Sequence, residues 1–272
     1  MSGPPQPGSR PVSRDIAELK ALAERQPELA PAVQMQVELI DAARRVQGRL
    51  TTPWIETPTE VLAARLQSGQ ALLDFDQIVF EWNDVRLLIR QITDILRRHQ
   101  AVDGDASLAL HAIGRSPELP ALMRAWFDRG EMPAIDMLDE VFAWASRPYL
   151  QRVAEVLQQR VPLDGWGRST CPICAAEPDF SLITTAGDRL LVCGRCHVRW
   201  PFHPIRCPYC GNDDRTTIKS LATPDGVYRL MSCRACSRYI KALDGRKASR
   251  PLLPYFDQIA TLPLDAAMAT QA

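Results

Sequence analysis

The sequence predicts an α+β protein, with an N-terminal all-helical domain, two tandem tetracysteine metal-binding modules and a short C-terminal helical segment. Apolar residues recur at helical spacing through about the first 160 residues of the 272-residue chain. All eight cysteines fall later, between Cys171 and Cys236, in four Cys-x-x-Cys pairs. Charge divides the chain at the same place: residues 1–164 carry a net charge of −5 and residues 165–250 carry +7, in a chain that is neutral overall.

These shifts in composition define five segments. We expect a flexible tail, a helical domain, a first tetracysteine ribbon, a second tetracysteine ribbon and a C-terminal segment at residues 1–13, 14–165, 166–205, 206–250 and 251–272. A hydrophobic content of 46% is enough to build a core and excludes a wholly disordered chain. No uncharged apolar run reaches the roughly 18 residues of a membrane span, and residues 1–14 lack the apolar stretch of a secretory signal. The sequence therefore predicts a cytoplasmic protein without membrane insertion.

The helical domain has its clearest pattern near the middle. Eight apolar residues spaced three or four apart fall on one helix face: Phe75, Ile78, Val79, Trp82, Val85, Ile89, Ile92 and Leu96. Further helices are expected at 14–25, 30–49, 58–68, 106–113, 117–129 and 134–159, separated by prolines and glycines. Pro148 falls inside the last of these helices and should kink or split it. Few stretches alternate with period two, so we expect no sheet before residue 165.

No catalytic constellation is evident in the helical domain. His99 and His111 are isolated, and we interpret them as surface residues or satisfied core residues. The tryptophans of this domain sit amid apolar helical patterns and are predicted core residues: Trp54, Trp82, Trp126 and Trp144. The alternative is that some of them line a groove for a partner helix or peptide.

The cysteine spacing is the most specific signal in the chain. The pairs are Cys171/Cys174, Cys193/Cys196, Cys207/Cys210 and Cys233/Cys236. The first two pairs are separated by 18 residues and the last two by 22, with only ten residues between the halves. A Cys-x-x-Cys turn offers two sulfurs to one ion, and a β-hairpin fits between two such turns. We therefore predict two rubredoxin-like or zinc-ribbon modules, each with a four-thiolate metal site.

Other uses of paired cysteines fit this pattern less well. Structural disulfides need an oxidising compartment, a thioredoxin-like motif uses one pair, and iron–sulfur clusters usually have other spacings. A cross-braced arrangement would join the first pair with the third and the second with the fourth. We favour the sequential arrangement, because strand-like stretches at 189–192 and 227–231 lead into the second and fourth pairs.

The residues around the cysteines suggest how such sites are supported. Zinc and rubredoxin-type iron both suit a tetrathiolate site, so the ion stays open. A divalent ion on four thiolates leaves −2 at each site, which reduces the +7 of residues 165–250 to +3. Nearby arginines are expected to neutralise the thiolates: Arg189, Arg195, Arg199, Arg206, Arg234 and Arg238. For the last five, the alternative is contact with a partner. We interpret His197 and His203 as surface or supporting residues, because eight cysteines already fill two sites. Aromatic residues are expected to form small apolar shells: Trp166, Trp200, Phe202, Tyr209, Tyr228 and Tyr239.

Several of these motifs together resemble the formate dehydrogenase accessory protein family, FdhE. The similar stretch begins at Cys171-Pro172-Ile173-Cys174 and continues through residues 187–196 and Trp200 to Arg206-Cys207-Pro208-Tyr209-Cys210-Gly211. It closes with residues 259–265, Ile-Ala-Thr-Leu-Pro-Leu-Asp, which is similar to the family's Leu-Ala-Thr-Leu-x-Leu-Asp ending. Two positions depart from the pattern: Ala175 stands where glycine is common, which should strain that turn slightly, and Pro263 interrupts the terminal motif.

The resemblance implies a cytoplasmic maturation factor and not an enzyme. Members of this family are needed for active respiratory formate dehydrogenases and are thought to bind the catalytic subunit before export. The resemblance also implies rubredoxin-type iron, with a redox role at the partner's active site as one option and a structural role as the other. On this basis the five arginines named above are candidate contacts for the catalytic subunit. We expect the segment Tyr255–Met268 to pack the ribbons onto the helical domain.

Two other classes of protein compete with this interpretation. A zinc-ribbon protein of transcription or RNA processing would use its arginines and aromatics on phosphates and bases. A net charge near +3 after the metal correction is low for that role, so we consider nucleic acid an improbable partner. A redox enzyme with ferric tetrathiolate centres would need a reducing partner that the sequence does not name.

Overall fold

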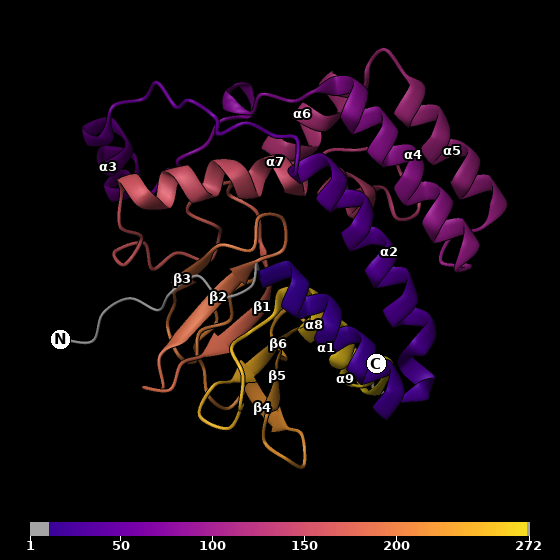
Figure 1. Cartoon of the computed structure of the whole chain (residues 1–272). Coiled ribbons are helices and arrows are strands. Elements are labelled where there is room, and N and C mark those ends of the chain that lie inside the picture. The colour runs from indigo at the N-terminus through magenta and orange to yellow at the C-terminus, as the bar shows by residue number, and fades with distance from the viewer. Residues whose placement is uncertain (1–10, 271–272) are drawn as a thin grey trace.

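The computed structural model describes residues 11–270, in which a helical part covers one end of a β-sheet (Figure 1). Residues 1–10 of the predicted tail (1–13) lie outside the described residues. Residues 11–13 belong to the first helix and not to a tail. The helices are α1 (Pro11–Arg25), α2 (Ala30–Gln47), α3 (Thr59–Ser68), α4 (Trp82–Arg98), α5 (Gly104–Arg115), α6 (Leu119–Arg129), α7 (Leu138–Arg160), α8 (Pro254–Ala260) and α9 (Leu262–Ala269). Two 3₁₀ turns, η1 (Pro27–Leu29) and η2 (Phe75–Gln77), complete the helical elements of this part of the chain.

The central helix α4 begins later than its apolar pattern suggests. Phe75 belongs to η2, which Asp74 and Gln77 close as a reciprocal capping box, and Ile78 is extended. From Val85 to Leu96 the predicted apolar face is buried, and α4 packs against α2, α5 and α7. The face was predicted correctly over α4, and Phe75 and Ile78 reach the same core from the turn before it, whereas the prediction for Val79 is wrong, because its side chain is 68% exposed.

Helix α7 is continuous through Pro148, so of the two predicted outcomes, a kink or a split, the split is wrong. A proline inside a helix removes one hydrogen bond at a cost of about 3 kcal/mol. Here the residues around it, from Ala145 to Leu150, are all buried between the other helices and the sheet. Burial of this turn outweighs the local penalty, and α7 lies as one rod across the top of the sheet (Figure 1).

The cysteine-rich part forms a single six-stranded sheet. Its strands are β1 (Pro178–Ile183), β2 (Arg189–Cys193), β3 (Arg199–Pro201), β4 (Ile218–Ala222), β5 (Tyr228–Cys233) and β6 (Arg238–Asp244), in the order β3-β2-β1-β6-β5-β4. Each half is an antiparallel three-stranded ribbon, as expected of a tetracysteine module. The halves are joined because β1 and β6 pair in parallel, with Phe180 opposite Lys241 and Ile183 opposite Asp244.

The first ribbon shares its core with the helices. One apolar cluster includes Ile92 of α4, Phe142 of α7 and Trp200 of β3, together with all four cysteines of the first ribbon. A smaller cluster lies between the ribbons, and its buried members are Phe180 and Val192 of the first ribbon, Leu243 of the second ribbon and Leu252 of the C-terminal segment. The first ribbon is therefore held by a large core, and the second ribbon extends from it.

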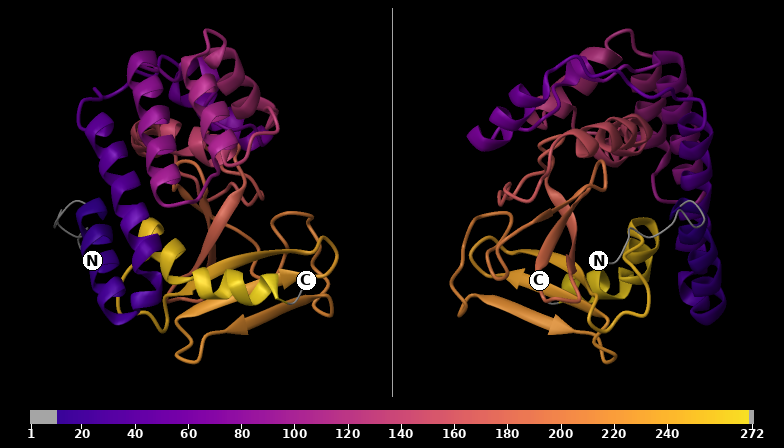
Figure 2. Two further views of the ribbon diagram at one scale, coloured as in Figure 1. Left: turned by 90° about the vertical axis from the view of Figure 1, so that its right-hand side faces the viewer. Right: turned by 60° about the vertical axis from the view of Figure 1, so that its left-hand side comes forward.

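The C-terminal helices tie the sheet to the first helix, which confirms the role predicted for the segment Tyr255–Met268. Tyr255 and Phe256 of α8 pack against α1 and α2, and the backbone N–H of Phe256 donates to Asp15 Oδ1 at 2.9 Å. On the other side, Asp265 of α9 accepts hydrogen bonds from Tyr239 and Lys241 of β6. Figure 2 shows these helices lying between the indigo N-terminal pair and the sheet.

None of the helices in the described range 11–270 is long and apolar enough to cross a membrane.

Candidate metal centres

The structure gathers the eight cysteines into two groups of four, in the sequential order. One group contains Cys171, Cys174, Cys193 and Cys196, and the other contains Cys207, Cys210, Cys233 and Cys236. Within each group the sulfur atoms lie within 4.8 Å of one another, and the closest pairs are 3.5–3.8 Å apart. Tetrahedral coordination with metal–sulfur bonds of about 2.3 Å places sulfurs about 3.8 Å apart. Both groups therefore fit one tetrahedrally held ion.

The chemistry of the first group also favours a cation. All eight cysteines are free thiols, and the sulfur separations are far beyond the roughly 2.05 Å of a disulfide. Burial raises the pKa of the Cys171 and Cys196 thiols well above its usual range. Four thiols cannot ionise together in such a pocket without a positive charge at its centre. A divalent ion supplies that charge, so these residues fit a structural or redox metal.

Each Cys-x-x-Cys turn closes with a residue in the left-handed conformation directly after its second cysteine. These residues are Ala175, His197, Gly211 and Ser237, with φ between 57° and 75°. In the first three turns the N–H of this residue donates to the carbonyl of the first cysteine, at 3.0–3.1 Å. Left-handed φ is costly for a residue with a Cβ atom, which supports the strain expected at Ala175.

Backbone N–H groups inside the turns point at the sulfurs. Ile173 donates to Cys171 Sγ at 3.4 Å, and Arg195 donates to Cys193 Sγ at 3.3 Å. In the second group the side chain of Asn212 donates to Cys233 Sγ at 3.5 Å. Such hydrogen bonds favour the thiolate, which is the form that binds a metal ion.

The helical domain holds the first metal centre from two sides. The backbone N–H groups of Leu72 and Leu73 donate to the carbonyls of Pro172 and Ile173, at 2.8 and 3.0 Å. From α7, the buried Arg147 donates to the carbonyls of Gly194 and Arg195, at 2.8 and 3.1 Å. Both Cys-x-x-Cys turns of this centre are thus bound through the residues between their cysteines.

Arg195 completes this interlock in the opposite direction. Its guanidinium lies 3.9 Å from the ring centroid of Trp126 and donates to the carbonyls of Trp126 and Phe127, both at 3.2 Å. These carbonyls are in the last turn of α6, where a cation is favoured by the helix dipole. Arg195 therefore attaches the metal centre to the helical domain.

The second metal centre is open to solvent. Cys207 and Cys233 are buried, Cys210 is exposed and Cys236 is half-buried. The hydroxyl of Tyr209, within the third Cys-x-x-Cys turn, donates to the carbonyl of Pro178 at 3.2 Å and thereby links this centre to β1.

The five candidate partner-binding arginines divide into two sets. Arg195 and Arg199 are half-buried, and Arg199 donates to the carbonyl of Leu252 at 3.1 Å. Arg206, Arg234 and Arg238 are exposed around the second centre. Arg238 forms two hydrogen bonds with Glu177 and lies 3.6 Å from the ring centroid of Tyr209. The exposed set is accessible from solvent, with Glu177 beside Arg238 and Asp213 3.7 Å from Arg206.

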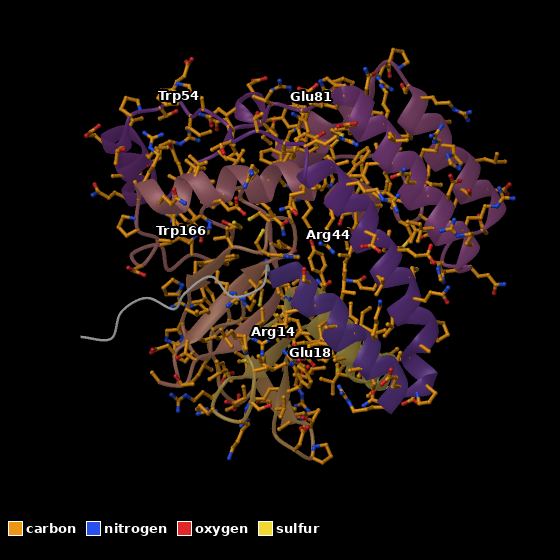
Figure 3. All side chains as sticks on the ribbon, in the orientation of Figure 1. Arg14, Glu18, Arg44, Trp54, Glu81 and Trp166 are labelled. Carbon is orange, nitrogen blue, oxygen red and sulfur yellow. The ribbon has the colours of Figure 1, made fainter. Side chains whose placement is uncertain are left out.

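Three of the four tryptophans of the helical domain behave as predicted. Trp126 is buried, and Trp82 and Trp144 pack partly buried against the core. The prediction for Trp54 is wrong, because its side chain is 85% exposed. Trp54 lies in the loop between α2 and α3, outside any helical face, and points away from the ribbon (Figure 3). It lines a cleft of about 610 Å³ together with Val79, as in the alternative groove interpretation.

The histidines take supporting or surface positions, as predicted. His99 and His111 pair with Glu38 and Asp94, both at 3.1 Å. His203 is exposed and accepts from the backbone N–H groups of the residues that lead into Cys207. His197 follows Cys196, and its Nδ1 lies 3.2 Å from the amide nitrogen of Gln151.

Two contacts that position the first centre were not predictable from local sequence patterns. Arg147 sits in an apolar helical pattern, where an arginine ordinarily faces solvent, and Leu72 and Leu73 follow a glycine-containing loop. The one available signal was that Arg147 directly precedes Pro148 within an otherwise apolar stretch.

Fold and site define the class of this protein: an all-helical domain that carries a sheet with two tetracysteine centres, each able to hold one metal ion. No protein-family model matches the chain. The FdhE homolog of Shewanella oneidensis is 31% identical over 158 residues, which are 56% of this chain and 52% of that protein. The FdhE homolog of Shewanella sp. strain MR-4 is 30% identical over 190 residues, 66% of this chain and 60% of that protein. The matched stretches thus span between half and two thirds of these relatives.

The crystal structure of the FdhE protein from Pseudomonas aeruginosa has the same fold, with a TM-score of 0.69. The alignment covers 98% of this chain and 94% of that chain at 21% sequence identity. The FdhE homolog of Aquifex aeolicus is 25% identical over 155 residues, which are 54% of this chain and 52% of that protein. These matches confirm the resemblance to FdhE proteins that the sequence motifs indicated, in sequence over half to two thirds of the relatives' length and in fold over nearly the whole chain.

Proposed function

We propose that this chain is an accessory factor for the maturation of formate dehydrogenase, which binds the catalytic subunit of that enzyme in the cytoplasm before export and has no catalytic activity of its own. The observation that supports this most strongly is the similarity to FdhE proteins, combined with two tetracysteine centres on a helical domain. The activity of those relatives comes to this chain only as part of the proposal.

The proposal assigns one metal ion to each centre, held by its four cysteines. Zinc and rubredoxin-type iron both fit the tetrahedral sulfur sets, and they differ in what they would do. Zinc would hold the turns in place, whereas iron could also exchange one electron with a partner. The first centre is buried and the second is exposed, so an exchange with a partner would use the second.

We place the contact with the catalytic subunit on the exposed face of the second ribbon. Arg206, Arg234 and Arg238 surround the open metal centre there. An acidic patch on the partner would be attracted to this face and would meet it faster at low salt. Arg195 and Arg199, which the sequence also suggested for this role, are held within the chain and in our proposal serve its internal contacts.

Anaerobic co-purification tests this function. The tagged chain should retain a formate dehydrogenase catalytic subunit and two metal ions, and should not oxidise formate alone. The double variant Arg206→Glu/Arg234→Glu should lose the catalytic subunit and keep both metal ions. The control variant Arg97→Glu, at an exposed position on α4, should keep the subunit and both ions. The proposal fails if the wild-type chain retains no subunit, or if it instead binds DNA or RNA in a salt-dependent manner.

A further inference from the structure

A polar cleft lies between the helical domain and the first metal centre. It has a volume of about 600 Å³ and is lined by the end of α2, the middle of α7 and the turn from Cys196 to Arg199. Such a volume is typical of sites that hold a small ligand or a short peptide segment. In Figure 3, Arg44 lies on the side of α2 that faces this cleft.

The charges that line the cleft are mainly positive. Arg44, Arg152 and Arg199 contribute three guanidinium groups, and Glu155 is the one carboxylate among the described lining residues. Glu155 is paired with Arg152 at 3.0 Å, and Arg199 donates to the carbonyl of Leu252 at 3.1 Å, so Arg44 is the most available cation of the cleft. The ion-pair partner of Arg44, Asp41, is 3.9 Å away, so this guanidinium is free to bind another anion.

Hydrogen-bond donors of the cleft are also left without partners. Arg152 Nε and His197 Nε2 are buried, and neither has a hydrogen-bond partner among the described residues. A buried polar nitrogen without a partner costs roughly 1–3 kcal/mol. Positive charge, unpaired donors and concave shape together select a ligand with carboxylates.

We propose that this cleft binds an acidic segment of a partner polypeptide, whose carboxylates reach Arg44 and Arg152 beside Cys196. The proposal rests on the proposed function only in that a partner polypeptide supplies the segment. Cys196 is 3% exposed while the other three sulfur ligands of its group are completely buried, so the segment covers the one side on which the first centre approaches solvent.

Anisotropy of a fluorescent tetraglutamate peptide, titrated with the full metal-loaded chain, tests the cleft. The variant Arg44→Gln should weaken binding about tenfold, the loss expected for one charged contact of about 1.4 kcal/mol. Arg45→Gln is the matched control, since it removes the same charge one residue along α2 outside the cleft, and it should change the affinity less than twofold. Glu155→Gln should strengthen binding, because it releases Arg152.

Equal losses in the Arg44 and Arg45 variants would overturn the proposal, and so would equal binding of a tetralysine peptide. Absence of saturable binding of tetraglutamate would also overturn it. No formate dehydrogenase is present in this titration, so its outcome is separate from that of the co-purification.

A second observation concerns a buried arginine at the start of β2. Arg189 is 3% exposed, and its Nε and Nη2 have no hydrogen-bond partner among the described residues. Its Nη1 donates to the carbonyl of Arg206 at 2.9 Å, directly before Cys207. None of the ion pairs within the described residues includes Arg189. Burial of an unpaired cation costs much folding free energy, so a negative charge is expected nearby.

The structure assigns Arg189 as the internal counter-charge of the second metal centre. Four thiolates around a divalent ion carry a net charge of −2. Arg189 lies close to this charge, because it donates to the carbonyl of Arg206, the residue directly before the ligand Cys207. Burial lowers the pKa of Arg189 to about 10, and the neighbouring Cys207 opposes this shift. The first ribbon thus supplies a positioning residue for the metal centre of the second. This assignment rests on metal binding and not on any partner.

Variants of Arg189 separate charge from hydrogen bonding. Arg189→Gln keeps a donor without charge, and Arg189→Lys keeps the charge. The zinc affinity of each centre is measured by chelator competition, with the steps assigned through Cys210→Ser. Arg189→Gln should weaken the second centre 10–100-fold and leave the first unchanged, while Arg189→Lys and the exposed control Arg215→Gln should stay within about threefold.

With iron in the second centre, Arg189→Gln should also lower the reduction potential, because loss of a nearby positive charge favours the more positive ferric ion. Arg189→Lys should leave it nearly unchanged. Equal effects of the two variants, or unchanged affinity and potential in Arg189→Gln, would overturn the assignment.

Discussion

Replacement of Arg147 by glutamine should loosen the first metal centre from the helical domain. The Arg147 guanidinium is buried in α7 and donates to the carbonyls of Gly194 and Arg195, the two residues between Cys193 and Cys196. It also lies 4.4 Å from the ring centroid of Trp144. Glutamine is too short to reach both carbonyls and carries no charge.

The expected loss follows from these contacts. Hydrogen bonds from a charged donor are each worth about 1.5–3 kcal/mol, and a cation–π contact is worth about 1 kcal/mol. Removal of a buried charge, whose Nη1 has no partner among the described residues, returns part of this energy. We therefore expect a net loss of about 3 kcal/mol. Unfolding entropy scales to about 0.6 kcal/mol per kelvin for a chain of this length, so the melting temperature should fall by about 5 °C.

Differential scanning calorimetry of the metal-loaded chain measures this shift. Arg97→Gln, an exposed substitution on α4, is the control and should change the melting temperature by less than 1 °C. Since Arg147 joins the helical domain to the first metal centre, its loss should also divide the single thermal unfolding transition into two. A melting temperature for Arg147→Gln within 1 °C of the wild type, at equal metal content, would refute the view that α7 holds this centre.

Three further predictions concern the metal centres and the pH dependence of stability. Cys210→Ser should release one ion and leave the fold intact by circular dichroism, whereas Cys193→Ser should release one ion and also lower the melting temperature, because only the first centre shares the large core; simultaneous loss of both ions in either variant would contradict separate centres. Ala175→Gly should raise the free energy of unfolding by about 1 kcal/mol in a denaturant titration, because it removes a left-handed φ of 57° from a residue with a Cβ atom; an unchanged value would show that this turn is unstrained. Burial raises the pKa of Asp15 from 3.8 to about 6, so the folded state holds this proton more tightly than the unfolded state, and the contribution to stability is lost as pH rises through 6. Asp15→Asn should therefore be stabilised relative to the wild type by more at pH 7.5 than at pH 3.8, with most of the change between pH 3.8 and 6; exposed Glu24→Gln is the control, and a difference independent of pH would count against this assignment.

Local patterns predicted the elements of this fold well. Helical periodicity predicted the ends of α2, α3 and α6 to within two residues. This was possible because the apolar pattern of a helix and the prolines and glycines that end it are close together in the sequence. The grouping of the cysteines followed from spacing for the same reason: a Cys-x-x-Cys turn and the hairpin behind it are both local structures.

Contacts between distant segments were not predictable in this way. The parallel pairing of β1 with β6 joins residues about 60 positions apart, and either strand alone has the pattern of a ribbon edge. The inward orientation of Arg195 depends on Trp126 and the end of α6, which no pattern near Cys193 reveals. Similarly, the burial of Pro148 is a property of the assembled core, and propensity alone predicts a break.

The contact between α1 and α8 has a consequence for synthesis of the chain on the ribosome. The hydrogen bond from the N–H of Phe256 to Asp15 joins residues 241 positions apart. At translation rates of about 5–20 residues per second, α1 emerges roughly 12 to 50 seconds before the segment that covers it. During that interval the apolar side of α1, including Leu19 and Leu22, lacks its C-terminal neighbours. The nascent protein therefore exposes apolar side chains of its N-terminal helix, which a general chaperone can cover until the last helices are synthesised.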